Sequence, residues 1–124
     1  MKASPPALEP LLPLSPAVFH ILVALAAGER HGYAIMQDVA ETTGGQIKMG
    51  PGTLYGTIKR MLEIGLIEEC GERRDPGLGD ERRRYYRMTD LGGRAASAET
   101  HRLSRIVGAA RRRGLAETLV PKPA

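Results

Sequence analysis

The chain has little of several residue types on which common classes of protein depend. Among its 124 residues there is one cysteine, Cys70, there is no tryptophan, and aromatic residues make up only 4%. A single cysteine cannot form an intramolecular disulfide, so a disulfide-stabilised fold is excluded and a reducing compartment is expected. We interpret Cys70 as a small strand residue rather than as a redox sensor.

Long apolar runs and secretion signals are absent from the sequence. No stretch of 18 or more apolar residues occurs, so no transmembrane helix and no membrane partner are expected. The N-terminus lacks a basic region followed by an apolar stretch and a cleavage site, which predicts a cytoplasmic protein. With 42% hydrophobic and 26% charged residues, the composition fits one ordinary soluble domain.

Patterns that would indicate catalysis or metal binding are also missing. The segment 50–53 lacks the lysine and the spacing of a phosphate-binding P-loop. His20, His31 and His101 have neither metal-ligand spacing nor cysteine partners. No grouping of serine, histidine and aspartate stands out. We therefore expect no enzyme activity, no metal site and no cofactor.

Positive charge is concentrated in one part of the chain. Residues 1–81 carry 7 Lys and Arg against 11 Asp and Glu, a net charge of −4. Residues 82–113 carry 10 Arg against Asp90 and Glu99, a net charge of +8. Such clustering is typical of proteins that bind a polyanion, although basic charge alone also occurs on simple solvated surfaces.

Three helices are predicted before any strand. Ser15 and Pro16 form an N-cap and a first helical position, and this helix ends at Gly28. A second helix covers roughly residues 31–44, where a pair of glycines stops it. A third runs over residues 51–64, again with proline at its first position. Apolar residues recur at helical spacing in all three.

Two strands and a long helix follow. Residues 66–72 and 82–88 are β-compatible, and the segment between them is rich in turn residues. Thr89 or Asp90 caps a last helix that reaches about residue 114. The expected fold is mainly α with a small β-hairpin: an irregular arm (1–14), a winged helix-turn-helix of order α-α-α-β-β (15–88), a long C-terminal dimerisation helix (89–114) and a flexible tail (115–124).

The side of the third helix that lies opposite its apolar stripe has few large side chains. Gly52 and Gly56 each lower helix propensity by about 1 kcal/mol relative to alanine. Close approach of the backbone to another surface would compensate for that loss. Hydroxyl groups and first-turn amides there suit phosphate. The candidates for DNA contact are Thr53, Tyr55, Lys59 and Arg60, of which the two basic residues could equally be solvated charges.

The second predicted strand carries four arginines. In a wing they would lie along a phosphate backbone or probe the minor groove. They could instead pair with acids on the first strand, and both can hold because the arginines outnumber those acids. We expect Tyr86 and Met88 to seal the core beneath the wing. The wing candidates for DNA contact are Arg82, Arg83 and Arg84, and the competing acids are Glu68, Glu69 and Glu72.

Four short motifs occur in a specific order. Segments 31–35, 52–55, 65–67 and 84–89 read HGYAI, GTLY, GLI and RYYRMT, and Gly92 follows. This series resembles the PadR family of bacterial transcriptional regulators over residues 15 to about 105. The resemblance implies a cytoplasmic, repressor-type winged-helix protein of the short subgroup with a single C-terminal dimerisation helix. By motif it also implies that Tyr33, Thr53 and Tyr55 contact DNA, and Lys59 by position.

The last helix predicts how two copies would assemble. Its apolar side, made of Leu103, Ile106, Val107 and Ala110, is more than a core of this size can cover, so a two-fold dimer is expected. Such a dimer would place two recognition helices about 34 Å apart on a palindromic operator in double-stranded DNA. The resemblance also suggests a small-molecule effector. A winged helix that binds an acidic protein and a sensor dominated by small-molecule binding remain the alternatives.

Overall fold

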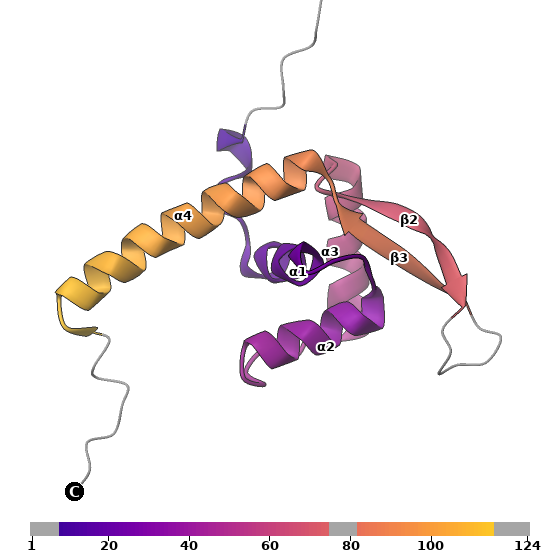
Figure 1. Ribbon diagram of the computed structural model, residues 1–124, viewed down its shortest axis with the longest axis horizontal. Coiled ribbons are helices and arrows are strands. Elements are labelled where there is room, and N and C mark those ends of the chain that lie inside the picture. Colours follow the sequence, from indigo (N-terminus) through magenta and orange to yellow (C-terminus); the bar gives the residue numbers. More distant parts are fainter. Residues whose placement is uncertain (1–7, 75–81, 116–124) are drawn as a thin grey trace, which may run out of the picture.

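The structure, a computed structural model, describes residues 8–74 and 82–115. The predicted fold class is confirmed: the chain is mainly helical, with a small antiparallel sheet (Figure 1). The predicted tail and most of the predicted loop between the strands lie outside the described residues. The elements in chain order are η1 (Glu9–Leu11), α1 (Pro16–Ala26), β1 (Arg30–His31), α2 (Gly32–Thr42), α3 (Pro51–Ile64), β2 (Ile67–Arg74), β3 (Arg82–Met88) and α4 (Asp90–Arg112).

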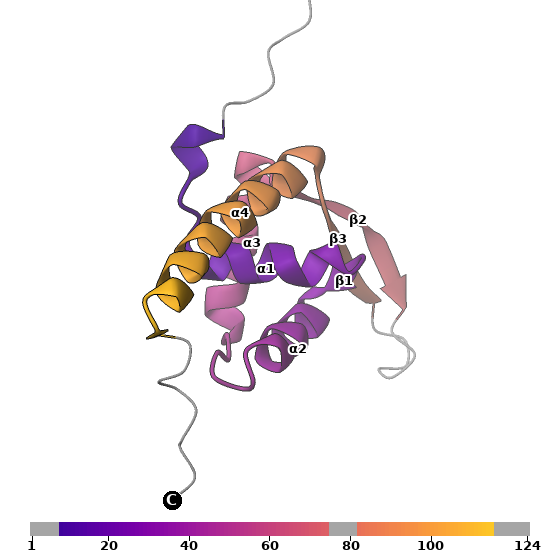
Figure 2. The same ribbon diagram turned by 60° about the vertical axis from the view of Figure 1, so that its left-hand side comes forward.

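Helix α1 is the centre of the core. It begins as predicted, because the Ser15 side chain accepts a hydrogen bond from Val18 N (3.3 Å) and Pro16 holds the first helical position. Ile21, Leu22, Ala24 and Leu25 are buried along it. Figure 2 shows α1 passing between α4 and α2, and both helices contact it. An apolar helix in this position joins the C-terminal helix to the rest of the fold.

Helix α3 is bounded by two residues with special backbone preferences. Pro51 stands at its start, and Gly65 ends it in the left-handed region with φ of 92°. The amides of Gly65 and Leu66 both donate to the carbonyl of Met61, at 3.0 and 2.9 Å. These bonds turn the chain directly from α3 into β2. The buried side chains are Leu54, Thr57, Ile58 and Met61, so the predicted apolar stripe is confirmed with Leu62 half-buried at its edge.

The sheet contains one strand that the sequence did not reveal. The strand order is β1-β3-β2, with antiparallel pairing throughout. The predicted hairpin is confirmed as β2 and β3, with a register shift between Glu69 and Glu72. Strand β1 has only two residues, Arg30 paired with Tyr86 and His31 paired with Tyr85. Two residues are too few to show the alternation by which a strand is recognised in a sequence.

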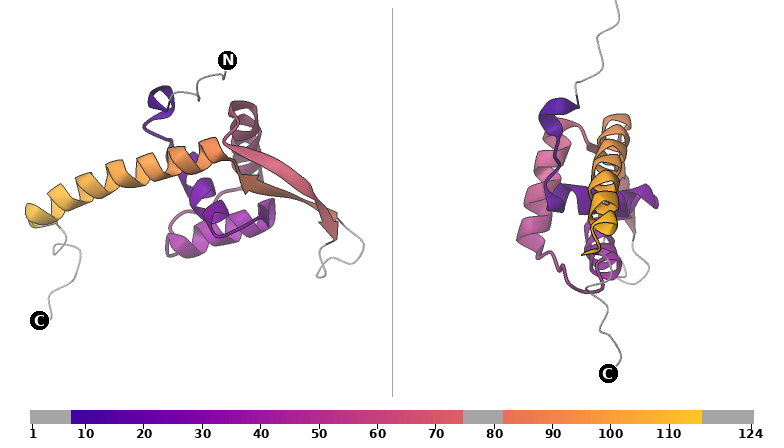
Figure 3. Two further views of the ribbon diagram at one scale, coloured as in Figure 1. Left: turned by 45° about the horizontal axis from the view of Figure 1, so that its top comes forward. Right: turned by 90° about the vertical axis from the view of Figure 1, so that its left-hand side faces the viewer.

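Helix α4 is docked tightly at its start and projects at its end. The Thr89 hydroxyl accepts from Gly92 N (3.1 Å) and donates to the carbonyl of Gly65 (2.5 Å). A Cβ at Gly92 would lie 2.0 Å from the Leu66 carbonyl oxygen, so only glycine allows this contact. The second half of α4 extends well beyond α1 (Figures 1 and 3). Among the described helices, none combines the length and apolar composition needed to cross a membrane.

Residues 8–14, which precede α1, are more regular than the sequence suggested. We expected an irregular arm over residues 1–14, but a single turn of 3-10 helix, η1, lies within it. Leu14 is buried, and Leu8, Leu11 and Leu12 pack against the core. The amide of Leu14 donates to Glu99 Oε2 in α4 at 3.1 Å. The prolines prevent a regular α-helix here but not packing through the leucines.

Candidate nucleic-acid interface

The outward side of α3 presents bare backbone beside a few polar side chains. A Cβ on Gly52 would meet nothing within 4 Å, and one on Gly56 would meet only Arg60 Nη1, at 4.0 Å. Thr53, Tyr55 and Lys59 are exposed around this strip, and 48% of the Tyr55 surface is accessible. Another surface can therefore approach the α3 backbone closely. We use the term glycine strip for Gly52 and Gly56.

The predicted DNA-contacting residue Arg60 makes a contact within α3. Its Nη2 donates to the Thr57 hydroxyl at 3.3 Å, and that hydroxyl donates to the Thr53 carbonyl at 2.7 Å. The Arg60 guanidinium therefore lies along the helix, next to the position of Gly56. It supplies positive charge at the edge of the glycine strip. Lys59 is exposed on the same side of α3.

A small cleft joins α3 to the wing and to the start of α2. Its volume is about 250 Å³. The Tyr55 ring lies on Gly32, because a Cβ at Gly32 would be 2.5 Å from Tyr55 Oη and 2.8 Å from Cζ. The structure thereby brings together residues predicted separately from three motifs. The cleft is lined by His31, Gly32, Tyr55, Arg82, Arg83, Arg84 and Tyr86.

Two arginines of the β2–β3 hairpin, which is the predicted wing, lie over aromatic rings. The Arg83 guanidinium lies over the Tyr33 ring, 5.3 Å from its centroid, and Arg73 lies over Tyr85 at 4.3 Å. Both are cation–π geometries. His31 stacks on Tyr33 with centroids 6.5 Å apart, meets Tyr85 edge-on at 5.3 Å, and accepts a hydrogen bond at Nδ1 from the Ala34 amide. Tyr33, expected to contact DNA, is thus also a platform for a wing arginine.

The alternative of cross-strand pairing is confirmed for two wing arginines. Arg84 lies 3.7 Å from both Glu69 and Glu72, and Arg87 lies 2.7 Å from its register partner Glu68. These pairs are exposed and contribute little stability, so they orient side chains more than they stabilise the hairpin. The predicted packing of Tyr86 and Met88 on the core beneath the β2–β3 hairpin is also confirmed. Tyr86 is buried, its pKa is raised by burial and then by Glu69, and Met88 packs against the core.

The contacts of Cys70 on β2 fit a structural role. Its thiol donates to Glu29 Oε2 at 3.1 Å, and Arg73 pairs with the same carboxylate. Burial and the Glu29 contact raise the thiol pKa, while the hydrogen bonds from Cys70 and Arg73 lower that of Glu29. A protonated thiol agrees with its interpretation as a small strand residue. Within the residues that the structure describes, no three His, Cys, Asp or Glu side chains gather as a metal site would require.

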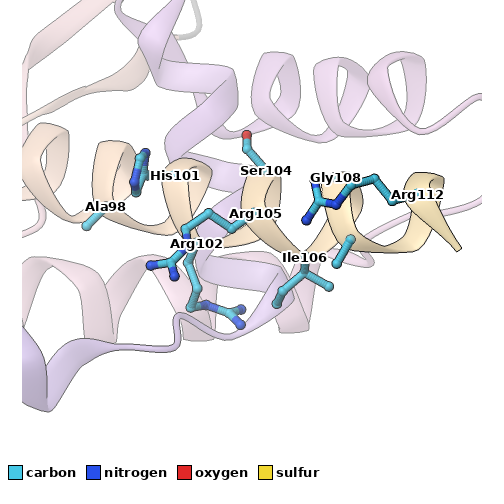
Figure 4. A pocket seen from close by; sticks show the side chains of 9 residues that line it. Ala98, His101, Arg102, Ser104, Arg105, Ile106, Gly108 and Arg112 are labelled. Carbon is cyan, nitrogen blue, oxygen red and sulfur yellow. The ribbon is translucent and has the colours of Figure 1, made fainter.

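The predicted dimer residues lie on the projecting half of α4. Ile106 and Val107 are 53% and 46% exposed, while Leu103 and Ala110 are half-buried. A groove of about 450 Å³ runs beside Leu103 and Val107 and is bounded on the α1 side by Phe19. A second hollow lies on α4 itself, where its lining side chains include His101, Arg105 and Arg112 (Figure 4). This hollow contains most of the basic side chains together with Ile106, and the groove beside Phe19 contains Leu103 and Val107 together with Arg111.

Comparison with known proteins identifies the family. Residues 21–98 match the model of the transcriptional regulator PadR-like family. The chain belongs to this family. The match runs from the second half of α1 through α2, α3 and the sheet to the start of α4, so the PadR resemblance seen in the ordered motifs is confirmed.

Two curated relatives extend the family match. An uncharacterised 37.1 kDa protein in transposon TN4556 of Streptomyces fradiae is 32% identical over 88 residues, covering 71% of this chain and 23% of the relative. Uncharacterised protein X of Lysinibacillus sphaericus is 33% identical over 73 residues, covering 58% of this chain and 63% of the relative. The PadR-like chain thus spans less than two thirds of the length of either relative.

Solved structures share the fold of this PadR-like chain. A PadR family regulator from Clostridium difficile aligns with a TM-score of 0.67 at 23% identity, covering 79% of this chain and 97% of the other. RosR of H. salinarum aligns with a TM-score of 0.62 at 26% sequence identity, covering 88% of this chain and 92% of RosR. Bacillus subtilis PadR in complex with operator DNA aligns with a TM-score of 0.57 at 22% sequence identity, covering 65% of this chain and 44% of that one.

Two residues of this PadR-like chain that shape the candidate site were not assigned that role from sequence. Gly32 belongs to the HGYAI motif, and its place under the Tyr55 ring appears only when α2 and α3 pack together. From the sequence, Glu99 was only counted among the charges of residues 82–113, yet only 2% of its surface is accessible. Its spacing of three from Arg102 was the one sequence signal, since such pairs face each other on a helix.

Proposed function

We propose that this protein is a homodimeric transcriptional repressor that binds a palindromic DNA operator and that a small-molecule effector releases it. In this proposal residues 15–88 form the DNA-binding unit and residues 89–114 the dimerisation helix of a cytoplasmic regulator. The observation that carries the proposal is the glycine strip on α3, open to solvent beside Tyr55 and Lys59. A helix of this kind can bring its backbone close to a DNA groove.

Phosphate groups fit the surroundings of the strip. Gly50, the N-cap of α3, makes no side-chain capping bond, so first-turn amides of the helix can donate to an anion. Arg82 and Arg83 line the adjoining cleft, and residues 82–113 carry a net charge of +8. Lysine and arginine near phosphates release counterions, which favours binding to duplex DNA. Tyr55 and Thr53 would add hydroxyl donors.

A second copy would double this surface. The exposed apolar residues of α4 would pack on the partner, and two-fold symmetry would present the two α3 helices to successive major grooves about 34 Å apart. The relative from B. subtilis was solved with operator DNA, which supports the same partner for this chain. An effector that tilts α4 against α1 would change the separation of the α3 helices and release DNA. α4 has no Trp, Phe or Tyr on which a flat ligand could stack.

The test begins with duplexes that the purified protein retains from a random pool. Tyr55→Ala and Lys59→Ala are each expected to weaken binding to them by tenfold or more, because one lost groove or phosphate contact is worth about 1–3 kcal/mol. Arg105→Ala, which removes an exposed arginine from the far side of α4, serves as the matched control. Unchanged affinity in both α3 variants would remove α3 from this role. Retention of no duplex would favour the winged helix that binds an acidic protein.

A further inference from the structure

Helix α4 is held by the rest of the described chain mainly through its first half. Its buried residues are Gly92, Ala95 and Glu99. Residues 100–112 follow, roughly 20 Å of helix at the usual rise per residue, and Figure 3 shows that this half extends beyond α1. Glu99 is therefore the last buried residue before the segment that carries the proposed dimer contacts.

The Glu99 carboxylate connects two parts of the molecule, α4 and the residue that precedes the N-cap of α1. Its Oε2 accepts from the Leu14 amide at 3.1 Å and from Arg102 Nη2 at 3.0 Å, and its Oε1 accepts from Arg102 Nε at 2.5 Å. Leu14 directly precedes Ser15, the N-cap of α1. The middle of α4 is thereby tied to the start of the helix on which it packs, 85 residues away in sequence.

A buried carboxylate is an unusual choice for holding two helices together. Removing a carboxylate from water is costly, and its partner Arg102 is 40% exposed, so this pair contributes little more stability than apolar packing would. What the carboxylate adds is direction: the two bonds from Arg102, within α4, orient the carboxylate, and the bond from the Leu14 amide then ties α4 to the residue before α1. An apolar residue at the same place would leave the start of α4 docked through Thr89 and Gly92, but would remove the hydrogen bond that sets the tilt of its second half.

The consequence of such a tilt is large for a protein that reads DNA as a dimer. A rotation of 10° at Glu99 would move the end of α4 by about 3 Å over its remaining length of roughly 20 Å. That displacement is close to the rise of one DNA base pair, about 3.4 Å. Since each protomer carries the same joint, two-fold symmetry applies the change on both sides.

We propose that Glu99 is a positioning residue that fixes the direction of α4 and thereby the half-site spacing that the dimer accepts. The role rests on the proposed function, since it requires a dimer that binds two half-sites. Leu14 and Arg102 are its partners, one supplying a backbone donor and the other a bidentate guanidinium. The segment before α1 thus takes part in operator selection without touching DNA.

The experiment varies the distance between half-sites. A duplex retained by the wild-type protein from a random pool is shortened or lengthened by one and two base pairs at its centre. Binding is measured for the wild type, Glu99→Gln and Glu99→Met, with Ile35→Val as a core truncation in α2 away from this joint. We expect the DNA affinity of the wild type and of Ile35→Val to fall at least tenfold at each altered spacing, relative to the original duplex. The affinity of both Glu99 variants should fall less than threefold.

A distance measurement covers the case in which a variant folds but binds DNA weakly. A spin label at Lys59→Cys in a Cys70→Ser background reports the separation of the two α3 helices in the free dimer. The Glu99 variants should broaden that distance distribution. An unchanged distance distribution would overturn the positioning role alone. So would an affinity that falls by the same factor at every half-site spacing. A wild-type protein that retains no duplex would overturn the proposed function and this role with it.

Discussion

The Tyr55 hydroxyl lies 2.5 Å from the point where a Cβ on Gly32 would stand. The first residue of α2 and the Tyr55 ring of α3 are therefore in contact at a place where a Cβ would overlap the ring in its present position. The same ring lines the cleft that contains Arg82 and Arg83. Because the position of Tyr55 depends on an absent side chain, small changes at residue 32 should affect DNA binding more than folding.

Gly32→Ala tests this dependence. The added methyl group must displace the Tyr55 ring, which can move because it is half-exposed, so we expect a stability loss below about 1 kcal/mol. DNA affinity should fall about tenfold, while the same substitution in a Tyr55→Ala background should have little further effect. Thermal melting and titration of a retained duplex measure the two quantities. Equal losses of affinity in both backgrounds would contradict the coupling.

Tyr33 can act through its hydroxyl or through its ring, and two substitutions separate these roles. The cation–π geometry with Arg83 predicts that Tyr33→Phe keeps most of the DNA affinity, because the ring that supports the guanidinium remains. Tyr33→Ala and Arg83→Ala should each lower the DNA affinity about tenfold. If Tyr33→Phe loses as much as Tyr33→Ala, the hydroxyl is itself the DNA contact and the platform role is wrong.

The buried Glu99 carboxylate predicts a pH dependence of stability. Arg102, which donates to both of its oxygens, lowers the pKa of Glu99 below its usual value. The stabilisation is therefore present above the unfolded pKa of about 4.3 and is lost as the pH falls through the folded value. The stability difference between wild type and Glu99→Gln should be constant from pH 7 to 5 and shrink toward pH 3. Thermal melts check this, with Glu63→Gln on the exposed side of α3 as the control.

The dimer proposal depends on the exposed side of α4. About half of the Ile106 surface is accessible, so burying it at a two-fold interface would contribute about 1 kcal/mol from each protomer. Ile106→Asp should place a charge there and give a folded monomer at micromolar concentration. Size-exclusion chromatography with light scattering measures the mass, and Arg105→Asp, on the basic side of the same helix, should remain a dimer. A monomeric wild type would disprove the assembly.

Much of the fold could be predicted because local residues determine it. Ser15, Pro16 and Pro51 start helices through their own backbone preferences, and Gly65 ends α3 with a positive φ. The candidate residues on α3 followed from helical spacing, from side-chain chemistry and from the resemblance of the GTLY motif. All of these signals are contained within a few neighbouring residues.

The features that were missed all depend on contacts between distant segments. Strand β1 exists because Arg30 and His31 pair with β3, and residues 8–14 pack on the core through their leucines and through the Leu14 bond to Glu99. The position of Tyr55 on Gly32 likewise requires α2 and α3 to be packed. A sequence pattern reports which side of an element is apolar, but not which polar group on a neighbouring element will meet it.

The glycine strip provides the most direct test of the account, because stability and DNA binding should respond in opposite directions. Alanine at residue 56 meets only Arg60 Nη1 at 4.0 Å, so Gly56→Ala should stabilise the protein by about 0.5–1 kcal/mol through helix propensity. If α3 brings its backbone against DNA, the same methyl group should weaken binding to a retained duplex at least tenfold. Measuring that affinity decides the matter: a loss in a more stable protein is the predicted result. Unchanged or tighter binding would contradict the role of α3.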